Sequence, residues 1–218
     1  MKIIDVNTWN RKSQYENFIK YSQPTFSLST RLDVTNLVEY AKNNNKSFFS
    51  CFLFILTKAV NEVEEMRTRL LSGNPVLYDT VHPSYIVIRD DEVIVTCQTE
   101  FTNNFNAFYE NSRKNIAEKK ATKGAPPFES HLGNDVFYIS CIPWMDLVSV
   151  INPYNYESNE QTSIPRITWG KYIKNALGRY EMGFDISVHH ALIDGFQVSK
   201  VVSKITDALN DLEKYLGE

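Results

Sequence analysis

The stretch EMGFDISVHHALIDGF, from Glu181 to Phe196, decides the fold class of this chain. Its first part alternates large apolar side chains with small or polar ones, which predicts a strand with one buried face from Glu181 to His189. Asp194 and Gly195 follow a short turn and are typical of a helix start, because the aspartate accepts hydrogen bonds from free amides of the first turn. The predicted closing helix carries one apolar stripe, which consists of Phe196, Val201, Val202, Ile205, Leu209 and Leu212.

Upstream of this stretch, strands and helices are mixed irregularly. Alternating patterns predict strands at 26–32, 136–142 and 164–173 and hairpins at 69–78 and 85–98, whereas helical spacing predicts helices at 35–43, 48–63 and 103–120. A Gly- and Pro-rich loop is expected at 122–133. Because hairpins outnumber parallel crossovers, we expect an α+β fold with a mixed, largely antiparallel sheet flanked by helices. No repeat or linker interrupts the pattern, so we expect a single domain over residues 1–218.

The composition indicates which kinds of partner and which cellular location to expect. The 218 residues include 23 Lys and Arg against 26 Asp and Glu, a net charge of −3, which does not favour nucleic acid as a partner. The longest apolar run, from Phe48 to Leu56, is too short for a membrane span, and we expect no membrane association. Three widely spaced cysteines, Cys51, Cys97 and Cys141, favour neither a disulfide framework nor a zinc site, so we expect a cytoplasmic protein.

Two of the four histidines, His189 and His190, are adjacent at the end of the last predicted strand. Strand alternation sends them to opposite faces, so at most one of them enters a shared pocket. A histidine at a strand end is most often structural, and the Asp194-Gly195 pair is by itself a helix cap. A metal site would need a third ligand at suitable spacing, and none is present, so we expect no metal.

The segment HHALIDGF, which begins at His189, resembles the HHxxxDG signature of the chloramphenicol acetyltransferases. Dihydrolipoyl acyltransferase cores and peptide-synthetase condensation domains share that signature, but further segments favour the first family. They are Trp9-Asn-Arg-Lys12, Val76-Leu-Tyr-Asp79, Val81-His-Pro-Ser-Tyr85, Ser140-Cys-Ile-Pro-Trp144 and Ile167-Thr-Trp-Gly-Lys-Tyr172. They resemble the family's W-x-R-K, V-I-W-D, V-H-P-x-Y, S-x-x-P-W and T-M-G-K-Y segments, in the same order and over nearly the whole chain. The resemblance implies a two-layer sandwich fold of the chloramphenicol acetyltransferase type.

The resemblance also implies catalytic roles. Transfer of an acetyl group from a thioester to an alcohol needs a base for the hydroxyl proton and a donor for the oxyanion. The family's base matches His190, and its oxyanion donor matches Ser140. Asp194 pairs in the family with the arginine of W-x-R-K, here Arg11, and this pair shapes the site and does not form a catalytic triad.

Further site residues follow from the same resemblance. The co-substrate is acetyl-CoA, with Lys46, Thr168, Lys171 and Tyr172 at the matching positions. Phe18 matches an aromatic residue that lines the acceptor pocket, and Tyr138 is expected beside Ser140 because both point the same way along their strand. The resemblance further implies a homotrimer with active sites at the subunit interfaces.

The departures from the family pattern concentrate around the acceptor pocket. The family's E-T-E-T-F-S-S-L-W segment is replaced by a segment that begins at Glu92 and lacks its aromatic residues, while Ile193 and Gln197 replace a cysteine and a histidine. We therefore expect a chloramphenicol O-acetyltransferase and keep two alternatives. One is a CoA-dependent O- or N-acyltransferase of the same mechanism that acts on another acceptor. The other is a catalytically silent CoA-binding protein.

Overall fold

The computed structural model describes residues 1–124 and 133–217. Most of the loop expected at 122–133 therefore lies outside the described residues. The main sheet has six strands, in the order β2 (Thr25–Asp33), β9 (Tyr180–His189), β8 (Arg166–Lys174), β7 (Val136–Ile142), β5 (His82–Ile88) and β6 (Ile94–Gln98). The β8–β7 and β7–β5 pairs are parallel, and the other three pairs are antiparallel. The sheet is mixed, and the α+β class predicted from the sequence is confirmed.

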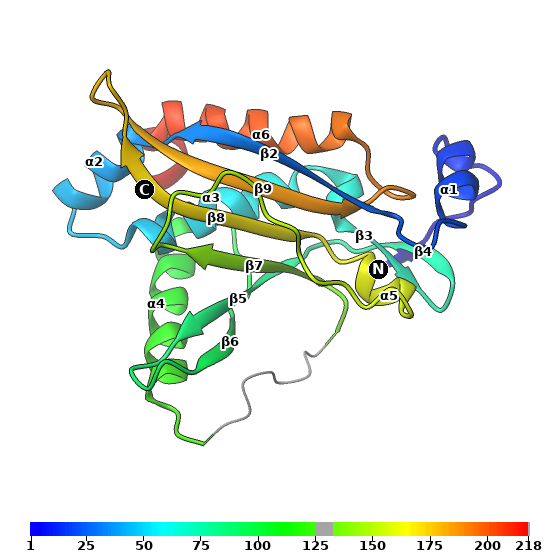
Figure 1. The fold of residues 1–218 in the computed structure, drawn as a ribbon, viewed down its shortest axis with the longest axis horizontal. Coiled ribbons are helices and arrows are strands. Elements are labelled where there is room, and N and C mark those ends of the chain that lie inside the picture. The colour runs from blue at the N-terminus through cyan, green and yellow to red at the C-terminus, as the bar shows by residue number, and fades with distance from the viewer. Residues whose placement is uncertain (125–132, 218) are drawn as a thin grey trace.

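Helices cover one face of this sheet (Figure 1). The central helix is α3 (Phe48–Asn61), which Ser47 caps by accepting a hydrogen bond from Ser50 N. Next to α3 lie α2 (Thr35–Asn43), α4 (Phe105–Ala121) and the closing helix α6 (Gly195–Asn210). The middle of the predicted apolar stripe enters the core, where Val201 and Ile205 are fully buried. Its two ends differ from the prediction, because Phe196 is 66% exposed and Leu212 lies beyond the end of α6. The helix–sheet layering follows directly from the apolar face of each element.

A smaller sheet and several short elements were not predicted from the sequence. The small sheet has the order β1 (Lys2–Ile3), β4 (Asn74–Leu77) and β3 (Thr68–Leu71), and it incorporates the predicted hairpin at 69–78. The unpredicted helices are α1 (Lys12–Phe18), α5 (Asn159–Thr162), α7 (Leu212–Leu216) and the 3-10 turn Glu64–Arg67. These elements are so short that hydrophobic periodicity does not register them, and their positions depend on tertiary contacts.

Two predicted element boundaries differ in detail. An aspartate just before the predicted helix at 35–43 favours Asp33 as its N-cap. Instead Asp33 ends β2, Val34 directly precedes α2, and Asp33 Oδ1 accepts a hydrogen bond from Thr35 N at 3.0 Å. Helix α3 ends at Asn61 and not at Val63. In both cases the chain must turn to reach the next packed element.

A long connection between β7 and β8 crosses the sheet face that the helices leave uncovered. At Gly183 a Cβ atom would lie only 1.8 Å from Leu147 O, so this glycine lets the connection lie directly against β9. Among the described residues, no helix combines the length and the apolarity needed to cross a membrane.

Candidate active site

His190 directly follows β9, and contacts with residues of the N-terminal part of the chain hold it in place. Its backbone amide donates to Pro24 O at 2.7 Å, and the three residues of the turn that follows it are fully buried. The imidazole is stacked on Phe18 at the end of α1, with ring centroids 3.7 Å apart and an interplanar angle of 11°. Phe26 of β2 contacts it from another side, at 4.6 Å. The side chain keeps 34% of its surface exposed, so a substrate can still reach it.

Asp194 connects this histidine to the N-terminal segment. Its Oδ2 accepts a hydrogen bond from Arg11 Nη1 at 2.9 Å, and its Oδ1 lies 3.3 Å from His190 Nδ1. The second contact is not aligned as a hydrogen bond, because Nδ1 makes none among the described residues. Asp194 also caps α6 in a capping box, in which Gln197 Oε1 accepts from the Asp194 amide at 3.0 Å. The structure thus brings together four of the predicted site residues, Arg11, Phe18, His190 and Asp194.

His189 has a different environment from its neighbour. It is fully buried, and its Nδ1 accepts a hydrogen bond from Ala191 N at 3.2 Å. Burial, and secondarily the nearby charge of His190, lowers the pKa of His189 to about 4. His189 is therefore neutral at pH 7 and supports the turn, while His190 is the histidine available for chemistry.

Ser140 lies on β7, on the sheet face away from the helices. Its strand neighbour Ile139 belongs to the core, and alternation turns Ser140 and Tyr138 toward the other face. Thr168 of β8 is the direct partner of Ser140 in the sheet register. The hydroxyl of Thr168 is buried and has no partner among the described residues. Ser140, Tyr138 and Thr168 thus form a second group of predicted site residues.

These two groups do not meet within one chain. Ser140 pairs with Thr168, and Thr168 pairs with Asp185 of β9, five residues before His190. Five residues of strand span about 16 Å, and two strand spacings add a lateral offset of about 10 Å. A single hydroxyl cannot contact both His190 and Ser140 at that separation. If the two groups act on one substrate, they must come from different copies of the chain.

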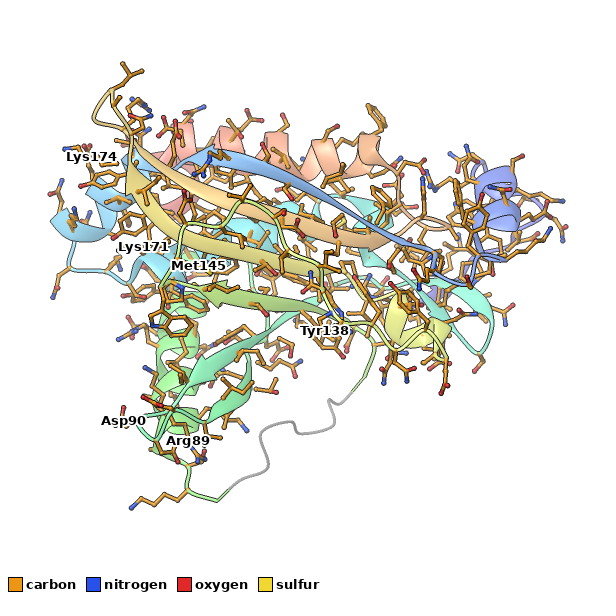
Figure 2. The ribbon with its side chains drawn as sticks, viewed as in Figure 1. Arg89, Asp90, Tyr138, Met145, Lys171 and Lys174 are labelled. Carbon is orange, nitrogen blue, oxygen red and sulfur yellow. The ribbon has the colours of Figure 1, made fainter. Side chains whose placement is uncertain are left out.

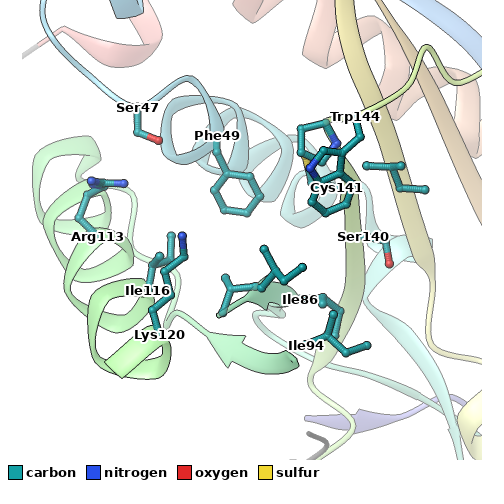
Figure 3. A pocket seen from close by; sticks show the side chains of 14 residues that line it. Ser47, Phe49, Ile86, Ile94, Arg113, Ile116, Lys120, Ser140, Cys141 and Trp144 are labelled. Atoms are coloured by element: carbon teal, nitrogen blue, oxygen red, sulfur yellow. The ribbon is translucent and has the colours of Figure 1, made fainter. Parts of the chain in front are cut away.

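Ser140 also borders two separate cavities. The first, which we call the α4 cavity, has a volume of about 440 Å³ and lies between the C-terminal end of β7 and α4. Figure 3 shows Phe49 extending into this space, Arg113 and Lys120 of α4 at one side, and Trp144 and Ser140 at the other. Its walls are mainly apolar, and its charged groups are both cations.

The second cavity, which we call the loop cavity, has a volume of about 760 Å³. It lies beside β7 and β8 under the β7–β8 connection, and its lining includes Ser140, Tyr138, Arg166, Asn152 and Pro153. Ser140 is therefore accessible from both cavities, which is the arrangement expected of a group that acts where two bound molecules meet.

The remaining predicted cofactor residues are dispersed around the C-terminal end of β8. Lys171 is exposed, and its amide donates to Met145 O at 2.8 Å; Figure 2 shows the two side by side. Tyr172 packs against Phe48, with ring centroids 5.0 Å apart. The ammonium group of Lys46 instead lies 4.5 Å from the ring centroid of Tyr109. Lys46 is not part of the α4 cavity lining, whereas its neighbour Ser47 is.

Sequence reasoning missed the cations that do line the cavities, namely Arg113, Lys120 and Arg166. Arg113 and Lys120 are seven residues apart on α4, and this spacing places them on one helix face. That signal was present in the sequence, but a cation on a polar helix face is usually only solvated. Outside residues 125–132 and 218, no cluster of His, Cys, Asp and Glu could hold a metal ion.

Solved structures of acetyltransferases share the fold of this chain. A solved dihydrolipoamide acetyltransferase from Azotobacter vinelandii superposes with a TM-score of 0.68 at 15% identity, covering 94% of this chain and 88% of that one. This likeness concerns the fold alone. A solved chloramphenicol acetyltransferase is more similar, with a TM-score of 0.84 and 26% identity over 96% of this chain and all of the other.

Sequence comparison is more specific. The family model described as chloramphenicol acetyltransferase matches residues 1–206. The chloramphenicol acetyltransferase of Clostridium perfringens is 28% identical, covering 99% of this chain and 98% of the relative. The enzyme of that name from Proteus mirabilis is also 28% identical, with 99% and 94% covered. This chain belongs to the chloramphenicol acetyltransferase family, as its motifs predicted.

Proposed function

We propose that this protein is an acetyl-CoA-dependent O-acetyltransferase with chloramphenicol as an acceptor. The observation that carries the proposal is the position of Ser140, which borders both the α4 cavity and the loop cavity. Group transfer requires a donor and an acceptor to meet at one point, and a residue that borders two cavities is suited to such a point. Family membership supplies the reaction class.

In the proposed reaction, His190 Nε2 takes the proton from the acceptor hydroxyl as the oxygen attacks the thioester carbonyl. The Ser140 hydroxyl donates a hydrogen bond to the oxyanion of the tetrahedral intermediate. The intermediate then collapses, the C–S bond breaks, and His190 returns the proton to the leaving thiolate. His190 Nδ1 faces Asp194, and the stacked Phe18 fixes the ring plane, so the base is oriented before substrate binds.

Two copies of the chain must build each site. The wide separation of His190 and Ser140 in one chain supports an assembly in which His190 faces a neighbour's Ser140. We propose the cyclic trimer that the family resemblance implies, in which every interface holds one such site. Exposed apolar side chains on the β7–β8 connection, including Val148 and Ile151, support the presence of a covering surface.

The α4 cavity is the proposed donor side. Its apolar walls suit the pantetheine arm of coenzyme A, and Arg113 and Lys120 suit its phosphates. We retain Lys171, Tyr172, Thr168 and Lys46 as contacts of acetyl-CoA, with Lys46 the furthest from the cavity lining. Free thiols at Cys51, Cys97 and Cys141 support the proposed cytoplasmic location.

The direct test is release of free thiol from acetyl-CoA with and without chloramphenicol, beside His190→Ala. Thiol release that requires both chloramphenicol and His190 is the expected result. Acetyl-CoA binding without release would favour the alternative acceptor, and tight binding without turnover of any alcohol or amine would favour the silent CoA-binding protein. A chain that does not bind acetyl-CoA would contradict all three.

A further inference from the structure

Arg166 places a positive charge in the wall of the loop cavity beside the proposed reaction centre. It begins β8 and is the register partner of Tyr138, two positions from the Thr168–Ser140 pair. Two residues of strand span about 7 Å and one strand spacing adds a lateral offset of about 5 Å, so its backbone lies within one small molecule's length of Ser140. Both side chains line the same cavity.

Aromatic rings hold the guanidinium in a defined plane. Its central carbon lies 4.2 Å from the ring centroid of Tyr154 and 5.7 Å from that of Tyr138. Nη1 donates a hydrogen bond to Pro153 O. Stacking of this kind leaves the N–H edge of the guanidinium, and not its faces, for a ligand.

The charge of Arg166 has no counter-ion among the described residues. The fully buried Arg69 also lacks an acidic partner among the described residues, but its three nitrogens donate to four backbone carbonyls. The buried Arg11 and Arg89 pair with Asp194 and Asp91. Arg166 makes no such pair, and its Nε is buried without any hydrogen-bond partner. A half-buried, permanently charged group with unused donors gains most from an anionic ligand whose oxygens accept in plane.

We propose that Arg166 is a specificity-determining residue that binds a carboxylate on the acceptor, so that the loop cavity selects hydroxyl compounds that also carry a carboxylate. This inference rests on the proposed function, because it takes the loop cavity as the acceptor side. The volume of about 760 Å³ accommodates an aromatic hydroxy acid. Neutral acceptors also fit the loop cavity, but they gain no ion pair with Arg166.

A matched pair of probes tests the charge alone. 4-(Hydroxymethyl)benzoate and 4-(hydroxymethyl)benzamide have the same shape and the same primary alcohol, and they differ by one negative charge. Calorimetry should show that the protein binds the benzoate at least about tenfold more tightly than the benzamide. Arg166→Gln should remove that preference and leave benzamide affinity within about twofold, and Arg166→Lys should retain part of it.

Arg179→Gln is the matched control, since it removes an arginine whose partner Asp33 lies on β2, outside the lining of the loop cavity. Equal binding of the two probes by the unmodified protein, or an unchanged preference in Arg166→Gln, would overturn the proposal. If Arg166 only holds the β7–β8 connection in place, Arg166→Gln will weaken both probes equally, which also overturns it. Thiol release with chloramphenicol is measured separately, so failure of the proposed function is not confused with failure of this inference.

Discussion

Phe18 and His190, which are 172 positions apart in the sequence, form a parallel ring stack, with centroids 3.7 Å apart. Phe18 is the last residue of α1, a seven-residue helix that contributes Tyr15 to the core. The ring stack gives α1 a second role, because it presents a flat apolar surface against which the proposed base is held. We therefore expect Phe18 to orient the imidazole in addition to lining the acceptor pocket, which is the role that its motif position predicts.

Phe18→Ala should lower kcat by about tenfold, because the imidazole loses the ring that fixes its plane and a small misplacement of a base is costly. The KM for acetyl-CoA should stay within about twofold, since Phe18 is not part of the α4 cavity. Phe18→Tyr retains the ring and should restore most of the rate. Steady-state kinetics on the three proteins decide this, and an unchanged kcat in Phe18→Ala would contradict the positioning role.

Mixing two inactive variants should restore activity. His190→Ala and Ser140→Ala should each be inactive alone, whereas an assembly refolded from equal amounts should regain about a quarter of the full rate. The fraction follows because half of the His190 positions and half of the Ser140 positions remain intact and combine at random. A mixture as inactive as its components would show that both residues act from the same chain.

Asp194→Asn should lower activity chiefly by weakening the structure. Asparagine still caps a helix, so this change isolates the loss of the carboxylate charge next to Arg11, which is 7% exposed. An uncompensated buried guanidinium costs about 3 kcal/mol of unfolding free energy, measured by denaturant titration. Asp146→Asn, which removes the exposed partner of Arg31, should cost less than about 1 kcal/mol. A normally stable Asp194→Asn protein with an altered pH–rate profile would indicate a direct catalytic role instead.

The cations of the α4 cavity should control the affinity for acetyl-CoA. A double variant that carries Arg113→Gln and Lys120→Gln should have a KM for acetyl-CoA about tenfold higher at low salt. Its kcat should be nearly unchanged. Lys114→Gln removes a cation from the same helix that pairs with Glu118 and does not line the cavity, so it serves as the control. Equal effects of the two changes would point to general charge and not to a phosphate site.

His189 should make the protein less stable in mild acid. Its pKa is about 4 in the folded chain and near 6.5 when unfolded, so the unfolded chain binds more protons between these values. Stability that is complete above pH 6.5 is therefore lost as the pH falls toward 4, by up to about 3 kcal/mol. His189→Gln should flatten this slope in urea titrations. A slope unchanged by the substitution would mean that other groups cause it.

Asp185 changes the pH dependence of stability in the opposite direction to His189. Burial raises the pKa of its carboxyl group, although Ser29 Oγ donates to it at 2.6 Å. The folded chain thus holds this proton more tightly than the unfolded one, which adds stability as the pH falls. Because Asp185 is present in both proteins, the difference between the unmodified chain and His189→Gln isolates the effect of His189.

Local pattern determined most of the elements. The alternation from Met182 to Val188, the cap at Ser47 and the start of α6 at Asp194 are interactions between residues a few positions apart, and these are the interactions that sequence periodicity records. The HHxxxDG segment and its companions likewise determined the family, because they identify residue types in a fixed order.

Only the tertiary structure determined which residues lie together at the candidate site. The pairing order of the strands places Ser140 far from His190. The β7–β8 connection brings Pro153 and Tyr154 to Arg166, which has no counter-ion in the part of the chain that the structure describes. The position of α4 brings Arg113 and Lys120 to a cavity that Lys46 does not line. Each of these relationships joins residues from separate elements. These relationships are stabilised by packing between whole faces of helices and strands, and a pattern within one short segment does not record that packing.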